Sequence, residues 1–229
     1  PNGAGKTTFF NLLSGNLKPT SGKLLYNGRD ITKTPLNRRA HIGIGRSFQI
    51  TNIFPNLSVF ENVRLAAQAK DSASMIMFTN AIRFSSYEDR ALEAIETVGL
   101  RGRERFLGSA LAHGEKRKLE LAMIVAADPE LMLLDEPTAG MATEQVPELI
   151  ATIDAIRKDG ERTIMLVEHN MSVVMSVSDK ITVMHNGAVL AEGTPADIAA
   201  NQNVQSAYLG ELYGDVMEAE INRQADTIS

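Results

Sequence analysis

The stretch Pro1-Asn2-Gly3-Ala4-Gly5-Lys6-Thr7-Thr8 decides the fold, because it matches the phosphate-binding loop pattern G-x-x-x-x-G-K-[ST] from the second position of that pattern onward. Gly3 and Gly5 let the backbone turn so that successive N–H groups face phosphate oxygens. Lys6 brings a positive charge to the β- and γ-phosphates, and the Thr7 hydroxyl is a ligand for Mg²⁺. We therefore predict that ATP or GTP binds to Asn2, Gly3, Ala4, Gly5, Lys6, Thr7 and Thr8.

A helix is expected directly behind this loop. Residues 7–14 carry apolar side chains at Phe9, Phe10, Leu12 and Leu13, and Gly15 ends the segment. The positive end of the helix then faces the bound anion. The alternative, a glycine-rich turn before an ordinary helix, is the weaker interpretation because Gly-Lys-Thr in this context is a specific motif.

The rest of the chain predicts an α/β fold with a mostly parallel sheet. Short, wholly apolar runs at 131–134 and 163–167 are typical of strands buried on both faces, and they alternate with helical segments. The region 55–115 interrupts this alternation with helices, one opened by a capping box at Ser58 and another predicted to open at Ser86. We expect a single nucleotide-binding domain over 1–229, an inserted helical subdomain at about 55–115 and a polar tail at 211–229.

Polar residues follow the predicted buried strands at the edge where ligands sit in open α/β sheets. Asp135 suits a Mg²⁺ ligand, and Glu136 suits the group that polarises the attacking water. His169 ends the next strand, where an imidazole can donate to the γ-phosphate. Gln49 can bridge Mg²⁺ and that water. Taken separately, the acids also fit a solvated loop and the histidine a surface or capping residue.

The composition excludes several classes of protein. The chain has 229 residues, a net charge of −5 and no cysteine, which rules out disulfides, thiolate catalysis and iron–sulfur clusters. The mild acidic balance argues against a generic nucleic-acid-binding domain. No apolar run approaches the roughly 18 residues that span a bilayer. Because the sequence opens inside a motif, we expect that residues before Pro1 are missing.

These motifs in this order resemble an ABC-type ATPase, the nucleotide-binding subunit of ATP-binding-cassette transporters. Residues 1–8 resemble its Walker A motif, Gln49 its Q-loop glutamine, 111–115 its signature, 131–136 its Walker B motif and His169 its switch histidine. Further stretches are similar to the ATPases of bacterial branched-chain amino acid importers: 19–22, 43–49, 135–141, 167–171, 192–195 and 207–210. Urea and amide importers and the lipopolysaccharide-exporting ATPase share much of this pattern.

The resemblance implies ATP hydrolysis that powers transport, with ATP and Mg²⁺ as cofactors. Glu136, His169 and Gln49 would be catalytic, and Thr7, Gln49 and Asp135 would hold the metal. The signature would close on the ATP of a second ABC subunit, identical or related, through Ala112, His113, Gly114 and Glu115. The other implied partners are transmembrane permease subunits and, indirectly, a solute-binding protein. No nucleic acid is expected, and the subunit would be peripheral on the cytoplasmic face of the inner or plasma membrane.

Three departures from the family pattern leave alternatives open. Ala112 replaces the signature serine, and Ala142 replaces the aspartate of the D-loop. The strands and the adenine-stacking aromatic that the family has before its Walker A motif are expected to be missing here. A cassette that binds ATP but hydrolyses it poorly therefore stays open, as does a non-transport ABC ATPase, although intact Glu136 and His169 favour hydrolysis.

Overall fold

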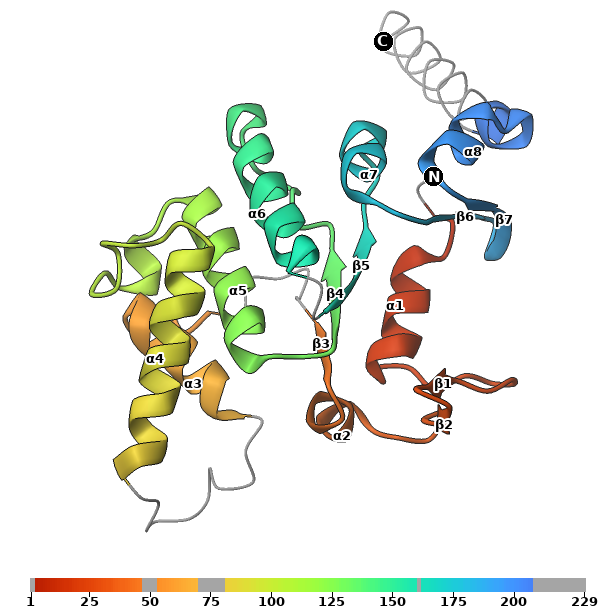
Figure 1. Cartoon of the computed structure of the whole chain (residues 1–229). Coiled ribbons are helices and arrows are strands. Elements are labelled where there is room, and N and C mark those ends of the chain that lie inside the picture. Colours follow the sequence, from red (N-terminus) through yellow and green to blue (C-terminus); the bar gives the residue numbers. More distant parts are fainter. Residues whose placement is uncertain (1–2, 47–52, 70–80, 160–161, 208–229) are drawn as a thin grey trace, which may run out of the picture. The chain divides into compact units, whose positions relative to one another are not determined.

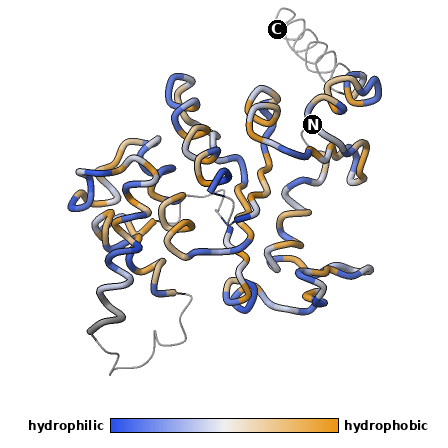
Figure 2. The backbone as a smooth tube through the Cα atoms, viewed as in Figure 1, coloured by the Kyte–Doolittle hydropathy of each residue, from blue (hydrophilic) through white to orange (hydrophobic). Residues whose placement is uncertain are grey.

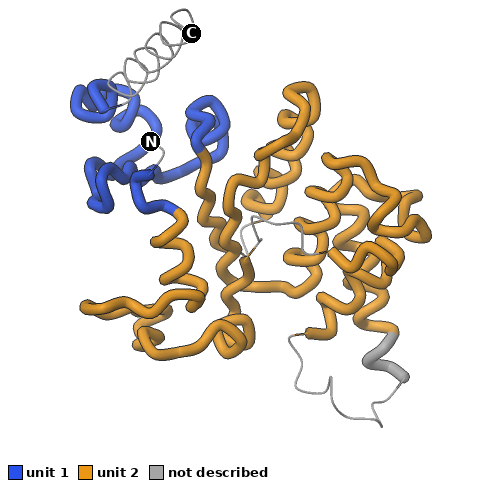
Figure 3. The backbone as a smooth tube through the Cα atoms, turned by 180° about the vertical axis from the view of Figure 1, so that it is seen from behind, with its two compact units in different colours: residues 1–6, 169–229 blue, residues 7–168 orange. Residues whose placement is uncertain are grey.

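The computed structural model describes residues 3–46, 53–69, 81–159 and 162–207, except for the side chains of 81–84. The chain forms two compact units, of which unit 1 comprises 1–6 and 169–229, and unit 2 comprises 7–168 (Figure 3). The elements in chain order are α1 (Lys6–Ser14), β1 (Leu25–Tyr26), β2 (Arg29–Asp30), α2 (Leu36–His41), β3 (Ile44–Arg46), α3 (Val59–Ala69), α4 (Ala81–Thr97), η2 (Gly108–Ala110), α5 (His113–Ala127), β4 (Leu131–Asp135), η3 (Thr143–Gln145), α6 (Val146–Lys158), β5 (Thr163–Val167), α7 (Met171–Val177), β6 (Ile181–His185), β7 (Ala188–Gly193) and α8 (Pro195–Ala200).

Unit 2 is built on a three-stranded parallel sheet with the order β3-β4-β5 (Figure 1). The strands β4 and β5 contain the two apolar runs, and the tube in Figure 2 is mostly coloured as hydrophobic residues there. The predicted α/β fold with a parallel sheet is therefore confirmed. In the described part of the chain, no helix is both long and apolar enough to cross a membrane.

Successive side chains of β4 pack against helices on opposite faces of this sheet. Met132 and Leu134 belong to the core formed with α5 and α6, whereas Leu133 packs in a separate core with Phe10 of α1. Successive side chains of a strand point to opposite faces. Asp135, two residues after Leu133, is therefore on the face that α1 covers. Gly45 on β3 lies on the opposite face, where an added Cβ would come within 2.8 Å of Pro129.

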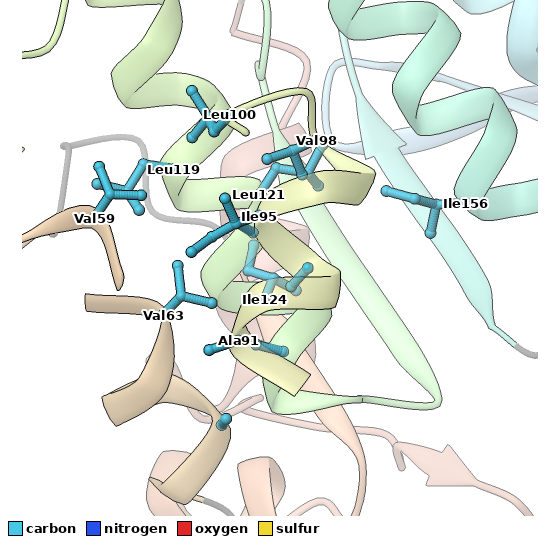
Figure 4. Close-up of a cluster of buried hydrophobic side chains, with 14 of the residues drawn as sticks. Val59, Val63, Ala91, Ile95, Val98, Leu100, Leu119, Leu121, Ile124 and Ile156 are labelled. Atoms are coloured by element: carbon cyan, nitrogen blue, oxygen red, sulfur yellow. The ribbon is translucent and has the colours of Figure 1, made fainter. Parts of the chain in front are cut away.

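The helices α3, α4 and α5 pack together around a hydrophobic cluster (Figure 4). Val63 of α3, Ile95 of α4 and Leu119 of α5 are fully or almost fully buried in it. The prediction that a helix opens at Ser86 is wrong, because α4 already begins at Ala81. Tyr87, Ala91 and Ile95 are buried in the same cluster, and this packing favours a continuous helix across Ser86. Tertiary packing therefore outweighs the local capping signal.

The start of α3 is fixed by Asn62, which is fully buried. Its side-chain oxygen accepts from the Phe54 N–H at 2.7 Å, and its amide donates to the carbonyls of Phe54 at 3.1 Å and Ser58 at 2.9 Å. The predicted Ser58 cap is also present, with the hydroxyl accepting from the Glu61 N–H at 3.1 Å.

We expect Asn62→Ala to lower the free energy of unfolding by about 3 kcal/mol, because it removes the hydrogen bonds of a fully buried amide, including the one that the Phe54 N–H donates to it. Chemical denaturation followed by circular dichroism measures this loss. The matched control is Asn37→Ala on an exposed face of α2, which should change stability by less than about 0.5 kcal/mol. A loss below about 1 kcal/mol for Asn62→Ala would contradict this role.

Two predicted hairpins are present, one in each unit. β1 and β2 meet at Asn27-Gly28, and β6 and β7 meet at Asn186-Gly187. All four residues have positive φ, as the tight hairpin turn requires. In unit 1 the helix α8 begins at a capping box, in which the Thr194 hydroxyl and N–H both donate to Asp197 and lower the pKa of that carboxyl.

Candidate nucleotide-binding site

The phosphate-binding loop turns at its glycines and contacts another turn of unit 1. Gly3 and Gly5 have φ of 71° and 93°, a conformation that suits a concave row of N–H groups. The Ala4 carbonyl accepts from the Gly187 N–H at 3.1 Å, and a Cβ on Gly5 would lie 3.3 Å from the Gly187 Cα. The loop therefore lies directly on the β6–β7 turn. The predicted binding residue Asn2 lies outside the described residues.

Helix α1 follows at once and starts with Lys6. Thr7 and Thr8, in its first turn, are exposed. A helix N-terminus directly after a glycine-rich loop is the usual anion-binding arrangement, because the first N–H groups of an α-helix have no acceptor in a preceding turn. Because residues four and seven apart share a helix face, Thr7 lies on the same face of α1 as Asn11 and Ser14.

The C-terminal end of α1 is anchored by Arg39, a fully buried residue of α2. Its guanidinium donates to the carbonyls of Leu12 and Leu13, at 2.5 and 2.6 Å, and to that of Ile31 at 2.9 Å. These bonds satisfy carbonyls that the helix end leaves open and place a positive charge at the negative end of its dipole. Burial lowers the pKa of Arg39. Arg39 thus fixes the helix that follows the phosphate-binding loop.

Asp135 ends β4 and is 2% exposed. Its Oδ2 forms an ion pair with Nη2 of Arg46 on β3 at 2.9 Å. The other guanidinium nitrogen of Arg46, Nη1, donates to Asn11 and Ser14 of α1. The predicted metal ligands Asp135 and Thr7 therefore belong to two elements joined by Arg46, which links Asp135 to the face of α1 on which Thr7 lies.

Glu136 sits in the left-handed region, with a φ of 46°. Its N–H donates to the Val167 carbonyl at 2.9 Å, which extends the pairing of β4 with β5 by one residue. Just beyond, the N–H and hydroxyl of Thr138 donate to the buried Glu168 carboxylate at 3.1 and 2.6 Å. Non-glycine residues in this conformation cost free energy and cluster at functional sites. The backbone here is held on both sides of Glu136.

His169 follows Glu168 and is the first residue of the second segment of unit 1. Its side chain is exposed. The next residue, Asn170, caps α7, with its side-chain oxygen accepting from the N–H groups of Ser172 and Val173 at 3.0 and 3.4 Å. His169 therefore directly precedes the capped start of α7.

The signature residues lie at the start of α5, where Ala112 is the N-cap. Ala112 and His113 are exposed, whereas Gly114 is buried. A Cβ on Gly114 would meet the Gln145 Oε1 at 2.5 Å. Glu115 accepts from the Ala112 N–H at 3.0 Å and pairs with Arg103 at 2.9 Å. Only one half of a capping box is made here, because an alanine has no hydroxyl to accept from the Glu115 N–H.

Restoring that hydroxyl should stabilise the protein. We expect Ala112→Ser to raise the free energy of unfolding by about 1 kcal/mol, since the extended backbone of Ala112 (φ −64°, ψ 162°) already suits an N-cap serine. Thermal denaturation measures the gain. Ala110→Ser adds the same hydroxyl to the exposed turn η2 and serves as the control. Equal melting temperatures for Ala112→Ser and the parent protein would refute the missing half-cap.

Sequence reasoning missed the two arginines that organise this site. The sequence places Arg46 in a motif but gives it no role. The available signal is its spacing of two from the buried Ile44, which puts both residues on the same face of a strand. Arg39 had no signal beyond its presence in a basic segment. The remaining predicted residue, Gln49, lies outside the described residues.

Comparisons with known proteins show the family of this chain. The family described as ABC transporter matches residues 1–139, and the family described as branched-chain amino acid ATP-binding cassette transporter matches residues 188–213. The high-affinity branched-chain amino acid transport ATP-binding protein LivG of Escherichia coli K12 is 38% identical over 216 residues, which cover 92% of this chain and 85% of LivG. The lipopolysaccharide export system ATP-binding protein LptB of the same strain is 34% identical, with 92% and 83% covered.

Solved structures show the same fold. MJ1267, an ATP-binding cassette of an ABC transporter, has a TM-score of 0.77 at 25% identity, with 91% of this chain and 85% of that one covered. CbiO1 of Clostridium perfringens, part of the ABC transporter complex CbiONQ, has a TM-score of 0.75 at 26% identity, with 95% and 84% covered. With a family match over more than half of its length and relatives well above 30% identity, the chain belongs to the ABC transporter family of ATP-binding proteins.

Proposed function

We propose that this protein is the ATP-hydrolysing subunit of an importer of branched-chain amino acids. The observation that carries the proposal is the similarity to LivG over 92% of the chain, at 38–39% identity. The match of residues 188–213 to the branched-chain amino acid family supports the same substrate class from a separate part of the sequence. Members of the family are ATPases that power transport, so hydrolysis itself follows from membership.

In this proposal, Asn2 to Thr8 bind the triphosphate, with Lys6 supplying the charge. The oxygen ligands Thr7, Gln49 and Asp135 suit Mg²⁺, which prefers hard oxygen donors and is bound by few carboxylates plus substrate phosphates. The buried Asp135, which Arg46 links to the face of α1 that bears Thr7, supports this assignment. When bound, Mg²⁺ would neutralise charge that develops on the phosphates.

The remaining assignments concern the attacking water. Glu136 would accept a proton from it, and the constrained backbone on both sides of Glu136 supports a fixed position for that carboxylate. The exposed His169, directly before the capped start of α7, would donate to the γ-phosphate. Gln49 would hold the water between them.

The partners follow from the subunit's place in a transporter. The exposed Ala112 and His113 are available to a second ABC subunit, whose ATP the signature residues Ala112–Glu115 would contact. Permease subunits would dock on the helical region near residues 50–100, with a solute-binding protein acting through them. CbiO1, whose structure is similar to that of this chain, is part of the ABC transporter complex CbiONQ. The subunit would then be peripheral on the cytoplasmic face of the membrane.

Reconstitution with permease subunits and a solute-binding protein of a branched-chain amino acid importer tests the substrate. In proteoliposomes, we expect leucine, isoleucine or valine to stimulate ATP hydrolysis and to accumulate on the side opposite the binding protein. Urea and short amides serve as competing solutes. Stimulation by urea or an amide, with no response to the branched-chain amino acids, would overturn the proposed substrate and leave the ATPase assignment standing.

A second candidate is lipopolysaccharide export, which the 34% identity to LptB favours. Lipopolysaccharide added to the same proteoliposomes distinguishes the two. A third, non-transport role would show as stimulation by nucleic acid in the absence of membrane subunits. The match over residues 188–213 supports import of branched-chain amino acids over these alternatives.

A further inference from the structure

Arg46 joins three parts of unit 2 through one guanidinium. Nη2 forms the ion pair with Asp135 Oδ2 at 2.9 Å, and Nη1 donates to Asn11 Oδ1 at 2.7 Å and to Ser14 Oγ at 2.8 Å. The guanidinium carbon lies 5.9 Å from the centre of the Phe10 ring, within the range of a cation–π contact. Strand β3, helix α1 and the end of β4 thus meet at this side chain.

The geometry explains why the residue is an arginine. A planar guanidinium presents several donors in a rigid fork, so one side chain can bond α1 and Asp135 at once, whereas a lysine ammonium acts as a compact point charge. The pair is also withdrawn from solvent, with 8% of the Arg46 side chain and 1% of the Asp135 side chain exposed. Opposite charges at such a site interact more strongly than at a surface, because little water screens them.

In the proposed function, Arg46 and a Mg²⁺ ion would both interact with the carboxylate of Asp135. We propose that Arg46 is a positioning residue that holds Asp135 against α1 and balances its charge until Mg²⁺ arrives with the nucleotide. This role rests on the proposed function, in which Asp135 is a metal ligand. Arg46 thereby sets how strongly nucleotide binding depends on Mg²⁺.

Two consequences follow from the charges. Without Arg46, the carboxylate of Asp135 faces the triphosphate uncompensated in the absence of Mg²⁺, so binding of free ATP should weaken by about tenfold or more. With Mg²⁺ present, the ion itself balances Asp135, and the competition from Arg46 is gone, so binding of Mg·ATP should change by less than about threefold.

The experiment measures dissociation constants of a fluorescent ATP analogue with excess Mg²⁺ and with EDTA. For Arg46→Gln, we expect the dissociation constant in EDTA, divided by that in Mg²⁺, to rise about tenfold relative to the parent protein. Arg46→Lys keeps the charge but not the fork, and should stay within about threefold of the parent ratio. The control Arg101→Gln removes an arginine that is 80% exposed in its pair with Glu96, and should leave the ratio unchanged.

A purely structural role would raise the dissociation constants in Mg²⁺ and in EDTA by the same factor. An unchanged ratio of the two constants in Arg46→Gln therefore overturns the inference. Equal ratios for Arg46→Lys and Arg46→Gln would also overturn it, because charge would then not be the cause. Should Arg46→Gln fail to fold, Asp135→Asn tests the same point. Removing the carboxylate charge leaves Arg46 to attract the triphosphate, so binding in EDTA should tighten, and weaker or equal binding contradicts the inference.

The design separates this inference from the proposed function. If the parent protein binds the analogue neither with Mg²⁺ nor with EDTA, the proposed nucleotide site itself is wrong. If the parent protein binds in both conditions and only the ratio fails to respond to Arg46→Gln, the nucleotide site stands and Arg46 has no part in its dependence on Mg²⁺.

Discussion

Replacing Glu136 with glutamine is expected to reduce ATP turnover by about 10²–10⁴-fold while leaving the dissociation constant for Mg·ATP within about threefold. The glutamine keeps the size of the side chain but cannot accept a proton from water. The backbone around position 136 should stay as it is, because it is held by the bond of its N–H to Val167 and by the bonds between Thr138 and Glu168. Turnover is measured as phosphate release, and binding with a fluorescent ATP analogue.

The matched control for this experiment is Glu93→Gln, which makes the same chemical change on an exposed position of α4. Turnover in the control should equal that of the parent protein. If Glu136→Gln hydrolyses ATP at the parent rate, Glu136 is not the general base. If instead it loses ATP binding together with turnover, the residue acts through the structure of the loop after β4.

Much of the fold was predictable because its signals are local. The strands β4 and β5 were visible as short apolar runs, since a parallel strand covered on both faces has no polar side. The turns Asn27-Gly28 and Asn186-Gly187 were equally readable, because the tight hairpin turn requires positive φ at both positions. In each case, a few adjacent residues contain the whole physical reason.

The start of α4 was not predictable in this way. A serine followed by acidic residues is a helix-opening signal in isolation, and Ser86 has it. In the structure, burial of the side chains that follow, in the cluster with α3 and α5, keeps the chain helical through that point. The free energy of packing an apolar face exceeds the preference for a cap.

The candidate site was predictable as a set of motifs but not as a set of contacts. The acids after β4 and the loop before α1 were each recognisable from residue type and spacing. The ion pair between Arg46 and Asp135 joins residues 89 positions apart, and it depends on β3 lying next to β4. Strand order is a property of the whole sheet. No local pattern around Arg46 specifies it.

The second large effect concerns Lys6. We expect Lys6→Ala to weaken binding of Mg·ATP by roughly 10–100-fold, because a hydrogen bond from a charged donor to a phosphate contributes about 1.5–3 kcal/mol. Lys6 is the first residue of α1, and alanine is a good helix former, so the helix should persist. Titration with the fluorescent ATP analogue measures the loss, and circular dichroism verifies the fold.

Lys18→Ala is the appropriate control, since it removes the same charge from an exposed position soon after α1 ends. A general electrostatic attraction between the protein and ATP would weaken binding alike in both variants, whereas a phosphate contact requires the loss to be confined to Lys6→Ala. The comparison with Glu136→Gln then separates binding from hydrolysis, because Lys6→Ala should bind ATP weakly and Glu136→Gln should bind ATP normally but hydrolyse it slowly. Tight binding by Lys6→Ala would mean that the loop at residues 1–8 does not hold the triphosphate.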